Sequence, residues 1–249
     1  MRLKIILALC TLSAAILAVD LYKIFLVVPD EASQGAIFRI IYFHVPAAIT
    51  SFTGFYVAMF SAIGYLMRKD LRFDAAAAAI NEVSLAFATI TLVTGSIWGR
   101  IIWGIWWTWD PRLTSFFVCW LIYVGYFMLR RAIDDPTARA RMSAVLSIFA
   151  CVDIVLVWKS IEWFRTQHPG PVLEIRGGGG MAPGMEAPLW WNLLALLMLS
   201  TALILIRTRQ EGMRLEIDAL RRELDQVKRM VEETEQSKKT VTRSPGPER

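Results

Sequence analysis

The sequence predicts an all-α, polytopic membrane protein with six transmembrane helices and a cytoplasmic C-terminal helical extension. Three observations lead to this fold class. Hydrophobic residues make up 55% of the 249 residues, and mean hydropathy is positive at +0.45. Charge is unevenly distributed, because residues 207–249 carry 20 of the 49 Lys, Arg, Asp and Glu residues. Six apolar segments in the remaining part are long enough to cross a bilayer, which takes roughly 20 residues of helix.

The six segments follow one another within residues 1–207, which we take as the membrane domain. They run over residues 5–28, 45–67, 75–96, 113–129, 142–158 and 187–206. The first contains Asp20 and Lys23, which are three residues apart and can neutralise each other on one helix face. Glu82 and Asp153 lie in the third and fifth. The first segment also fits a signal peptide, since a basic start precedes it, but no convincing cleavage site precedes a polar mature start.

The basic residues of the connecting loops predict the orientation. The N-terminus, the loops at 68–72 and 130–141 and the C-terminal part together hold 20 Lys and Arg residues, whereas the other three loops hold six. Basic loops stay preferentially on the cytoplasmic side. We therefore predict that both termini are cytoplasmic. Residues 29–44, 98–112 and 159–186 then form three loops on the outer face of the membrane.

The charged C-terminal part predicts a cytoplasmic amphipathic helix over residues 208–236. Apolar residues recur there with the 4-3 spacing of a coiled-coil seam, namely Met213, Ile217, Leu220, Leu224, Val227 and Val231. The seam spans just under three heptads, so a short coiled coil and a solvated amphipathic helix without a partner explain it equally well. Residues 237–249 are polar and contain Pro245 and Pro247, and we expect them to form a disordered tail.

Charge and motif content argue against several classes of function. The net charge of +5 arises from basic residues balanced by acids, without a basic face, so no nucleic-acid partner is indicated. Cys10, Cys119 and Cys151 lie in apolar segments and form no CxxC or CxxCH motif. This argues against a disulfide framework, a thioredoxin site and covalently attached haem. The sequence has no P-loop motif, so any ATP hydrolysis belongs to a partner.

The second outer loop is rich in tryptophan. It holds half of the ten Trp residues, namely Trp98, Trp103, Trp106, Trp107 and Trp109. An aromatic belt at the membrane interface explains two or three Trp at a helix end, but not five accompanied by glycines. Gly99 and Gly104 permit close approach, so the indole faces suit a large planar apolar ligand. Arg100 and Arg112 can pair with carboxylates on such a ligand.

The two histidines of the chain, His44 and His168, fall in the first and third outer loops. A lone His at a membrane boundary is more often a satisfied polar residue than a ligand. Together with a platform for a planar ligand, the two histidines favour a haem site, because imidazole is an axial ligand of haem iron. We therefore predict one site built from three loops. In it the histidines lie above and below a porphyrin, Trp residues lie along its edge, and Arg residues contact its propionates.

Several stretches of the chain together resemble a known family. They are RIIYFHVPAA at residues 39–48, LVTGSIWG at 92–99, WGIWWTWDPRLTS at 103–115 and IEWFRTQH at 161–168. Over about residues 21–207 the chain resembles the cytochrome c maturation protein C (haem exporter protein C) family. These are six-helix, haem-handling membrane proteins with an external tryptophan-rich WWD domain. The central Trp motif and the preceding His-Val-Pro are highly specific for the family.

The resemblance implies that haem b is held non-covalently and transiently at the periplasmic face of the bacterial cytoplasmic (inner) membrane. It implies delivery of this haem to a periplasmic haem chaperone, together with ABC-transporter subunits and a small single-helix membrane protein. It assigns His44 and His168 as axial ligands, and residues 98–110, ending at Asp110, as the haem platform within about 98–115. Arg39 and Arg112 match basic positions of the motif, and their contact with propionates is our inference. We expect no catalytic residue and no enzymatic activity.

The chain departs from the family pattern at Pro111, at Asp153, where an Asn is expected, and in the glycine-rich run 177–180, which bears on chaperone docking. Two other functions stay open. One is a haem–cytochrome c ligase of the same wider family, although such ligases usually carry more helices or a large extra domain. The other is an ion-coupled transporter that uses Asp20, Glu82 and Asp153, which leaves the Trp cluster unexplained.

Overall fold

The computed structural model describes residues 2–170, 181 and 184–242, with side chains up to residue 234. Its elements are α1 (Arg2–Leu26), the 3-10 helix η1 (Ala36–Ile40), α2 (Ile41–Arg68), α3 (Leu71–Ile102), α4 (Pro111–Ala132), α5 (Pro136–Trp163) and α6 (Glu186–Thr242). Within these described residues, six helices, with η1 leading into α2, are long and apolar enough to cross a membrane. The predicted all-α fold with six membrane-spanning helices is therefore confirmed, whereas the cytoplasmic location of both termini stays a prediction.

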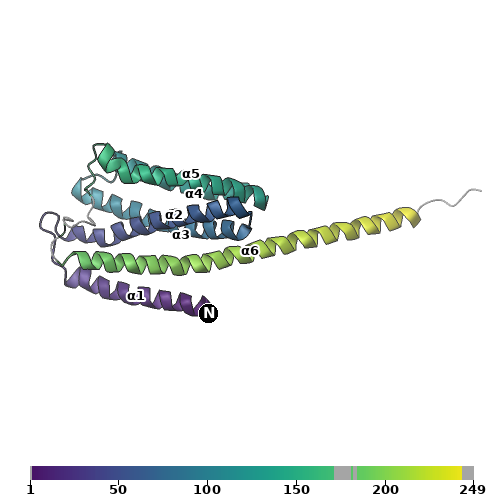
Figure 1. The fold of residues 1–249 in the computed structure, drawn as a ribbon, viewed down its shortest axis with the longest axis horizontal. Helices are drawn as coiled ribbons and strands as arrows, with labels where there is room; N and C mark the ends of the chain where they lie inside the picture. Colours follow the sequence, from purple (N-terminus) through teal and green to yellow (C-terminus); the bar gives the residue numbers. More distant parts are fainter. Residues whose placement is uncertain (1, 171–180, 182–183, 243–249) are drawn as a thin grey trace, which may run out of the picture. The chain divides into compact units, whose positions relative to one another are not determined.

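The chain divides into two compact units, Met1–Thr208 and Arg209–Arg249. In the first unit the helices lie side by side (Figure 1). α2, α3, α4 and α5 share a buried cluster that includes Phe55, Ala88, Tyr123 and Ile154, one from each helix. The rings of Phe55 and Tyr123 stack with centroids 3.6 Å apart. The four helices that bear the predicted site therefore form one packed group.

Aspartate side chains begin three of these helices. Asp70, Asp110 and Asp135 precede α3, α4 and α5, and each accepts a hydrogen bond from a backbone N–H of the first turn. Such caps satisfy N–H groups that have no partner inside the helix. Pro111 and Pro136 follow as the first helical residues, a position where a missing N–H costs nothing. The turns between helices are thus encoded locally.

α1 and α6 pack against each other and against α2. Ser13 of α1 donates a hydrogen bond to the carbonyl of Ala195 in α6 (2.8 Å). Ile24 of α1, Tyr42 of α2 and Leu189 of α6 are completely buried in one further cluster. Leu196 packs against a cluster of α2 and α3 residues. These contacts join both helices to the group formed by α2–α5.

Several helices extend beyond the apolar segments of the sequence. α2 begins at Ile41, so His44 is helical, and α3 continues to Ile102, so Trp98, Gly99 and Arg100 are helical as well. α5 likewise runs past Lys159. α6 includes residues 237–242, for which the sequence predicts disorder, while residues 243–249 lie outside the described residues. The predicted loop boundaries were wrong because an uncharged window marks only the hydrocarbon-spanning part of a helix. Charged residues continue the helix where their side chains reach water.

Lys23 acts electrostatically on the Asp20 carboxyl, as the spacing predicts, but the two side chains form no close ion pair in the described structure. Asp20 is 2% exposed, whereas Lys23 is exposed, and within the described chain no ion pair joins them. The three-residue spacing places the two side chains near each other along the helix, but only Asp20 lies on the buried side of α1.

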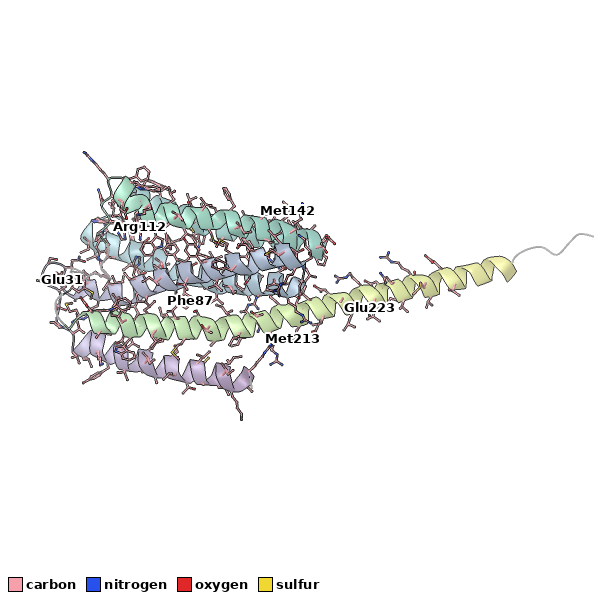
Figure 2. The ribbon with its side chains drawn as sticks, in the orientation of Figure 1. Glu31, Phe87, Arg112, Met142, Met213 and Glu223 are labelled. Atoms are coloured by element: carbon pink, nitrogen blue, oxygen red, sulfur yellow. The ribbon has the colours of Figure 1, made fainter. Side chains whose placement is uncertain are left out.

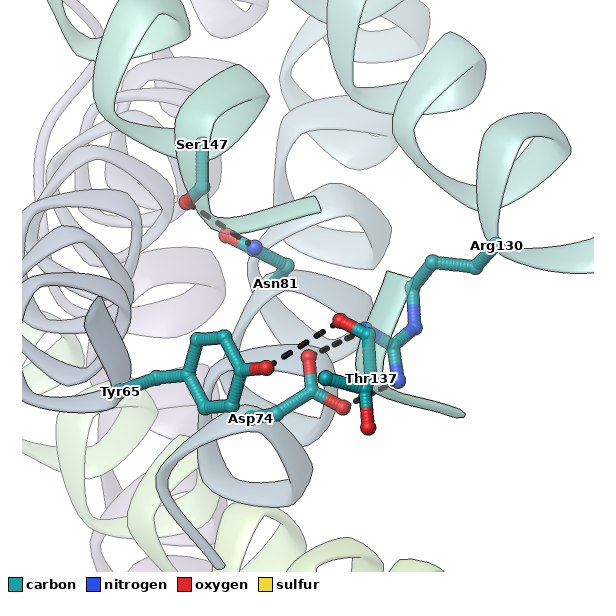
Figure 3. Close-up of polar contacts among 6 residues, drawn as sticks. All are labelled: Tyr65, Asp74, Asn81, Arg130, Thr137 and Ser147. Atoms are coloured by element: carbon teal, nitrogen blue, oxygen red, sulfur yellow. Dashed lines mark hydrogen bonds and ion pairs between the residues drawn. The ribbon is translucent and has the colours of Figure 1, made fainter. Parts of the chain in front are cut away.

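Polar contacts gather at the end of the first unit where α3 and α5 begin and α2 and α4 end (Figure 3). Arg130 of α4 forms two hydrogen bonds with the carboxylate of Asp74 in α3, at 2.6 and 3.0 Å. Tyr65 of α2 donates to the carbonyl of Thr137 at the start of α5 (3.2 Å). Asn81 joins α3 to Ser147 of α5 at 3.3 Å. This end of the bundle is therefore held by a polar network.

Candidate functional site

A cavity of about 480 Å³ lies at the opposite end, where α2 and α4 begin and α3 and α5 end. Its volume is in the range of small-molecule and cofactor sites, and its walls are mainly apolar. Six predicted site residues line it, namely His44, Trp98, Trp103, Trp107, Arg112 and His168. Figure 2 labels Arg112 at this end and Met142 toward the other end of α5. The structure thus brings both histidines and three of the five clustered tryptophans to one cavity.

His44 lies in the first turn of α2 and is oriented by α3. Its Nδ1 is 2.9 Å from Oγ1 of Thr94, and the Thr94 hydroxyl itself donates to the carbonyl of Ile90 (2.7 Å). With the Thr94 hydroxyl donating to this carbonyl, its oxygen accepts from His44, so we assign the imidazole proton to Nδ1. Nε2 then holds a lone pair, which is the form of histidine that binds a metal.

Gly95 allows this approach of His44 to α3. A Cβ atom at position 95 would lie 3.0 Å from Cε1 of His44, closer than real side-chain contacts normally are. The residue beside Thr94 must therefore be small for the ring to reach the hydroxyl. Thr94 and Gly95 were not identified as functional from the sequence. Their signal was the helical spacing to Trp98, three and four residues later, which places all three near one face of α3.

Pro46 creates a second constraint on the start of α2. Proline has no N–H, so the carbonyl of Tyr42 four residues earlier loses its helical partner. Asn192 of α6, which is 1% exposed, donates from Nδ2 to this carbonyl at 2.8 Å. A carbonyl that proline leaves without a helical donor is thus satisfied from another helix. The contact fixes the turn that carries His44.

His168 stands in the segment after α5. Its Nδ1 is 2.8 Å from the carbonyl oxygen of Pro169, which can only accept, so Nδ1 is protonated here as well. Burial lowers the pKa of His168 below its ordinary value, although Pro169 and Asp110 oppose this effect. The ring is therefore neutral at pH 7, with Nε2 available as a ligand. Both histidines present the same ring nitrogen.

Asp110 ties the His168 segment to the start of α4. Besides capping α4, its carboxylate accepts hydrogen bonds from the Thr166 hydroxyl and from the Gln167 N–H, both at 2.8 Å. Thr166 Oγ1 in turn accepts from the His168 N–H at 3.0 Å. Burial acts to raise the pKa of Asp110, but these hydrogen bonds together outweigh it and hold the pKa below its usual value. Asp110 is a positioning residue, and sequence reasoning placed it in the platform without this role.

The tryptophans divide into two groups. Trp98 and Trp103 meet edge to face at 4.9 Å, and the Trp98 indole N–H donates to Oε1 of Gln34 (2.9 Å). Trp103 folds over Gly99, where a Cβ would lie 3.2 Å from its ring. In contrast, Trp106 and Trp109 are 61% and 75% exposed and lie outside the cavity lining. Gly99 thus permits packing of one Trp on the end of α3.

Gly104 and two predicted arginines also lie outside the lining. Gly104 has a positive φ of 76°, which its turn requires, and its carbonyl accepts a hydrogen bond from Arg100. Arg39 donates to the carbonyls of Ile24 (2.8 Å) and Val28 (3.1 Å) and pairs with Asp30. Arg39 therefore fastens the end of α1 to η1, and its contact with a ligand stays a prediction.

Arg112 is the arginine at the cavity. Its guanidinium donates to the carbonyl of Val157 in α5 and lies 5.7 Å from the ring centre of Trp158. A guanidinium has five N–H donors, so these contacts leave donors for an anionic group of a ligand. The cavity therefore combines two nitrogen ligands, aromatic walls and one cation.

The carboxylates considered for ion transport do not converge on this cavity. Asp20, Glu82 and Asp153 are all absent from its lining within the described residues. Glu82 of α3 accepts from Nε of Arg207 in α6 (3.0 Å). Asp153 of α5 lies against Cys119 of α4. The three carboxylates therefore do not form one pathway within the described residues. The glycine-rich run 177–180, which bears on chaperone docking, lies outside the described residues.

Comparison with known proteins is consistent with this arrangement. The sequence pattern of the family described as heme exporter protein C matches residues 1–223. The heme exporter protein C of Bradyrhizobium diazoefficiens is 35% identical over 207 residues, which cover 83% of this chain and 78% of the relative. That of Escherichia coli K12 is 39% identical over 183 residues, 73% of each chain, and that of Paracoccus denitrificans 36% over 184 residues, 74% and 76%. The chain therefore belongs to the heme exporter protein C family.

Proposed function

We propose that the protein binds haem b non-covalently at the periplasmic face of the bacterial cytoplasmic membrane and delivers it to a periplasmic haem chaperone during cytochrome c maturation. Membership of a family named for haem export supports the haem substrate. The observation that carries the proposal is the pair of histidines at one apolar cavity. Each has Nδ1 bound to an oxygen acceptor and Nε2 left for iron.

In this proposal His44 and His168 coordinate the iron from its two sides. Trp98, Trp103 and Trp107 pack against the porphyrin, and Arg112 contacts a propionate. Indole faces hold the porphyrin by apolar contact without forming a covalent bond. The protein thus grips haem through contacts that can be broken one at a time, as delivery requires.

The two ligands differ in how they are held. His44 is part of a long helix, whereas His168 stands in a segment anchored by the hydrogen bonds of Asp110. We infer that a chaperone takes haem from the His168 side, since displacement of that segment breaks fewer helical contacts. The exposed rings of Trp106 and Trp109 lie in the connection before α4 and provide an apolar docking surface for it.

The proposal includes partners that supply energy. The sequence has no P-loop, so ATP hydrolysis belongs to ABC-transporter subunits, which act with a small single-helix membrane protein. We assign the membrane domain to residues 1–207, with the haem platform at about 98–115. A cytoplasmic amphipathic helix follows over 208–236, and both termini are cytoplasmic.

An absorption spectrum of protein purified from haem-replete cells tests haem binding. The wild type is expected to show a Soret band, which weakens or shifts in His44→Ala and in His168→Ala and is lost in the double variant. Added imidazole restores the band of each single variant, because it supplies the missing nitrogen ligand. Trp163→Phe, an exposed residue outside the cavity lining, is the control. Absence of porphyrin from the wild type would rule the proposal out.

Co-purification with the chaperone tests delivery separately. Trp106→Ala is expected to keep its Soret band but to recover less chaperone complex, whereas Trp103→Ala and Trp107→Ala also lose haem. Haem found covalently attached to a CxxCH protein in the absence of the chaperone would favour the ligase function instead. Unchanged complex formation in all three variants would contradict a docking role for the tryptophans.

A further inference from the structure

The second unit carries an apolar stripe that no described residue covers. Its members follow the heptad spacing and are between 44% and 60% exposed, namely Met213, Ile217, Leu220, Leu224, Val227 and Val231. Figure 2 labels Met213 and Glu223 on this part of α6. In a coiled coil such a stripe is buried against a second helix. The stripe therefore lacks a partner within the described part of the chain.

Charged residues flank this stripe in a fixed order. With Ile217 at heptad position a and Leu220 at position d, the two flanking positions are e and g. Basic residues occupy three successive e positions, namely Arg214, Arg221 and Lys228. Glu216 and Glu223 occupy the g positions that precede the last two of these. One edge of the stripe is therefore basic and the other acidic.

This order of charges distinguishes between partners and orientations. In a parallel pair of identical helices, each g residue meets the e residue of the following heptad on the other helix. Glu216 then faces Arg221 of the second copy, and Glu223 faces Lys228 of the second copy. In an antiparallel pair g residues face g residues and e residues face e residues, so like charges meet. The charges therefore favour a parallel pair.

Intrachain contacts leave these charges accessible. Within the described residues, Arg221 has one long contact, with Asp218 at 3.9 Å, and its side chain is 74% exposed. A pair of this kind at the surface contributes little. Breaking it in favour of Glu216 of a second copy therefore costs little.

We propose that the segment of α6 from Met213 to Val231 binds the same segment of a second copy of this chain as a parallel two-stranded coiled coil. Ile217 at a with Leu220 at d, and Val231 at a, follow the pattern that favours two strands, whereas Leu224 at a with Val227 at d departs from it. Copies inserted in one membrane share one orientation, so the parallel alignment is the one available to them. The common membrane also raises the effective concentration, which offsets the short length of the seam.

Disulfide cross-linking of the full chain in membranes tests the proposal. Cys10, Cys119 and Cys151 are replaced by Ala, and a single cysteine is introduced by Leu220→Cys or, on the opposite side of the helix, by Arg222→Cys. A parallel pair brings residue 220 of two copies together, so oxidation is expected to give about tenfold more cross-linked dimer for L220C than for R222C. Equal cross-linking at both positions, or a product between this chain and another polypeptide, would overturn the proposal.

Charge reversal adds a test with its own rescue. The variant E216K/E223K makes both edges of the stripe basic, and its L220C dimer is expected to fall about tenfold. Adding R221E/K228E reverses every pair and restores the dimer, which shows that the loss did not come from misfolding. With the native cysteines kept, mass measurement of the solubilised chain gives the same comparison of dimer and monomer. Charge-insensitive dimers, or trimers, would refute the two-stranded parallel arrangement.

Discussion

At the scale of single residues, the two histidines reach the same tautomer by different means. The His44 ring contacts the Thr94 hydroxyl, which donates to a helix carbonyl, and the backbone of Thr91, whereas His168 relies on the backbone carbonyl next to it. A hydrogen bond to one ring nitrogen fixes the tautomer and orients the other nitrogen toward a metal. The site therefore depends on Thr94 as well as on the histidines.

Thr94→Val tests this dependence at unchanged side-chain size. The valine cannot accept from Nδ1, so His44 loses the side-chain contact that orients its ring, and we expect haem affinity to fall about 10–100-fold. Haem loss to an excess of apomyoglobin, followed in the Soret band, measures the change. Thr201→Val is the matched control, because the Thr201 hydroxyl on α6 donates only to the carbonyl of Leu197 in the described structure. Equal haem loss from both variants would show that Thr94 does not position His44.

Residue types in the sequence predicted several of the side chains that line the cavity, but not the role of each one. His44, His168 and Trp107 line it as expected. Asp110 belongs to the Trp motif, yet its carboxylate holds the His168 segment. That role depends on the path of the chain after α5, which no local spacing encodes. Arg39 shows the same limit, since its partners are carbonyls at the end of α1.

At the scale of helices, hydropathy predicted where each membrane segment lies and misplaced its ends. The window at 75–96 corresponds to α3, which continues to Ile102. The difference matters because Trp98 stands on the helix extension and not on a loop. A helix that rises above the hydrocarbon needs no apolar surface there, so hydropathy carries no signal for it.

The start of α2 allows a prediction about helix packing in the membrane. Asn192→Leu removes the donor to the Tyr42 carbonyl that Pro46 leaves without a helical partner. We expect the variant to lose about 1–3 kcal/mol of stability, the cost of a buried unsatisfied polar group. Thermal unfolding in detergent measures the loss.

A second substitution provides the control for this prediction. Pro46→Ala restores an N–H that can reach the Tyr42 carbonyl within α2, so N192L should cost less in the P46A background than in the wild type. The difference between the two costs isolates the hydrogen bond. Equal costs in both backgrounds would show that Asn192 acts through packing alone.

At the scale of the first unit, the candidate site and a buried ion pair that stabilises the fold lie at opposite ends of the helices. The cavity lies where α2 and α4 begin, and the pair formed by Asp74 and Arg130 lies where α4 ends. The side chains of this pair are 4% and 11% exposed. Removing one partner of a buried ion pair leaves the other charge unsatisfied, whereas replacing both by apolar residues is often tolerated.

Arg130→Met therefore should lower stability by about 3–5 kcal/mol, because it leaves the Asp74 carboxylate buried without its cation. The double variant D74L/R130M should recover much of this loss, since no charge remains to be paired. Lys159→Met, in a pair whose side chains are 44% and 63% exposed, should change stability by less than about 1 kcal/mol. Thermal unfolding measures all three, and the Soret band of Arg130→Met below its unfolding temperature should match that of the wild type. A change in that spectrum would mean that the two ends of the helices are coupled, so that the polar network also shapes the cavity.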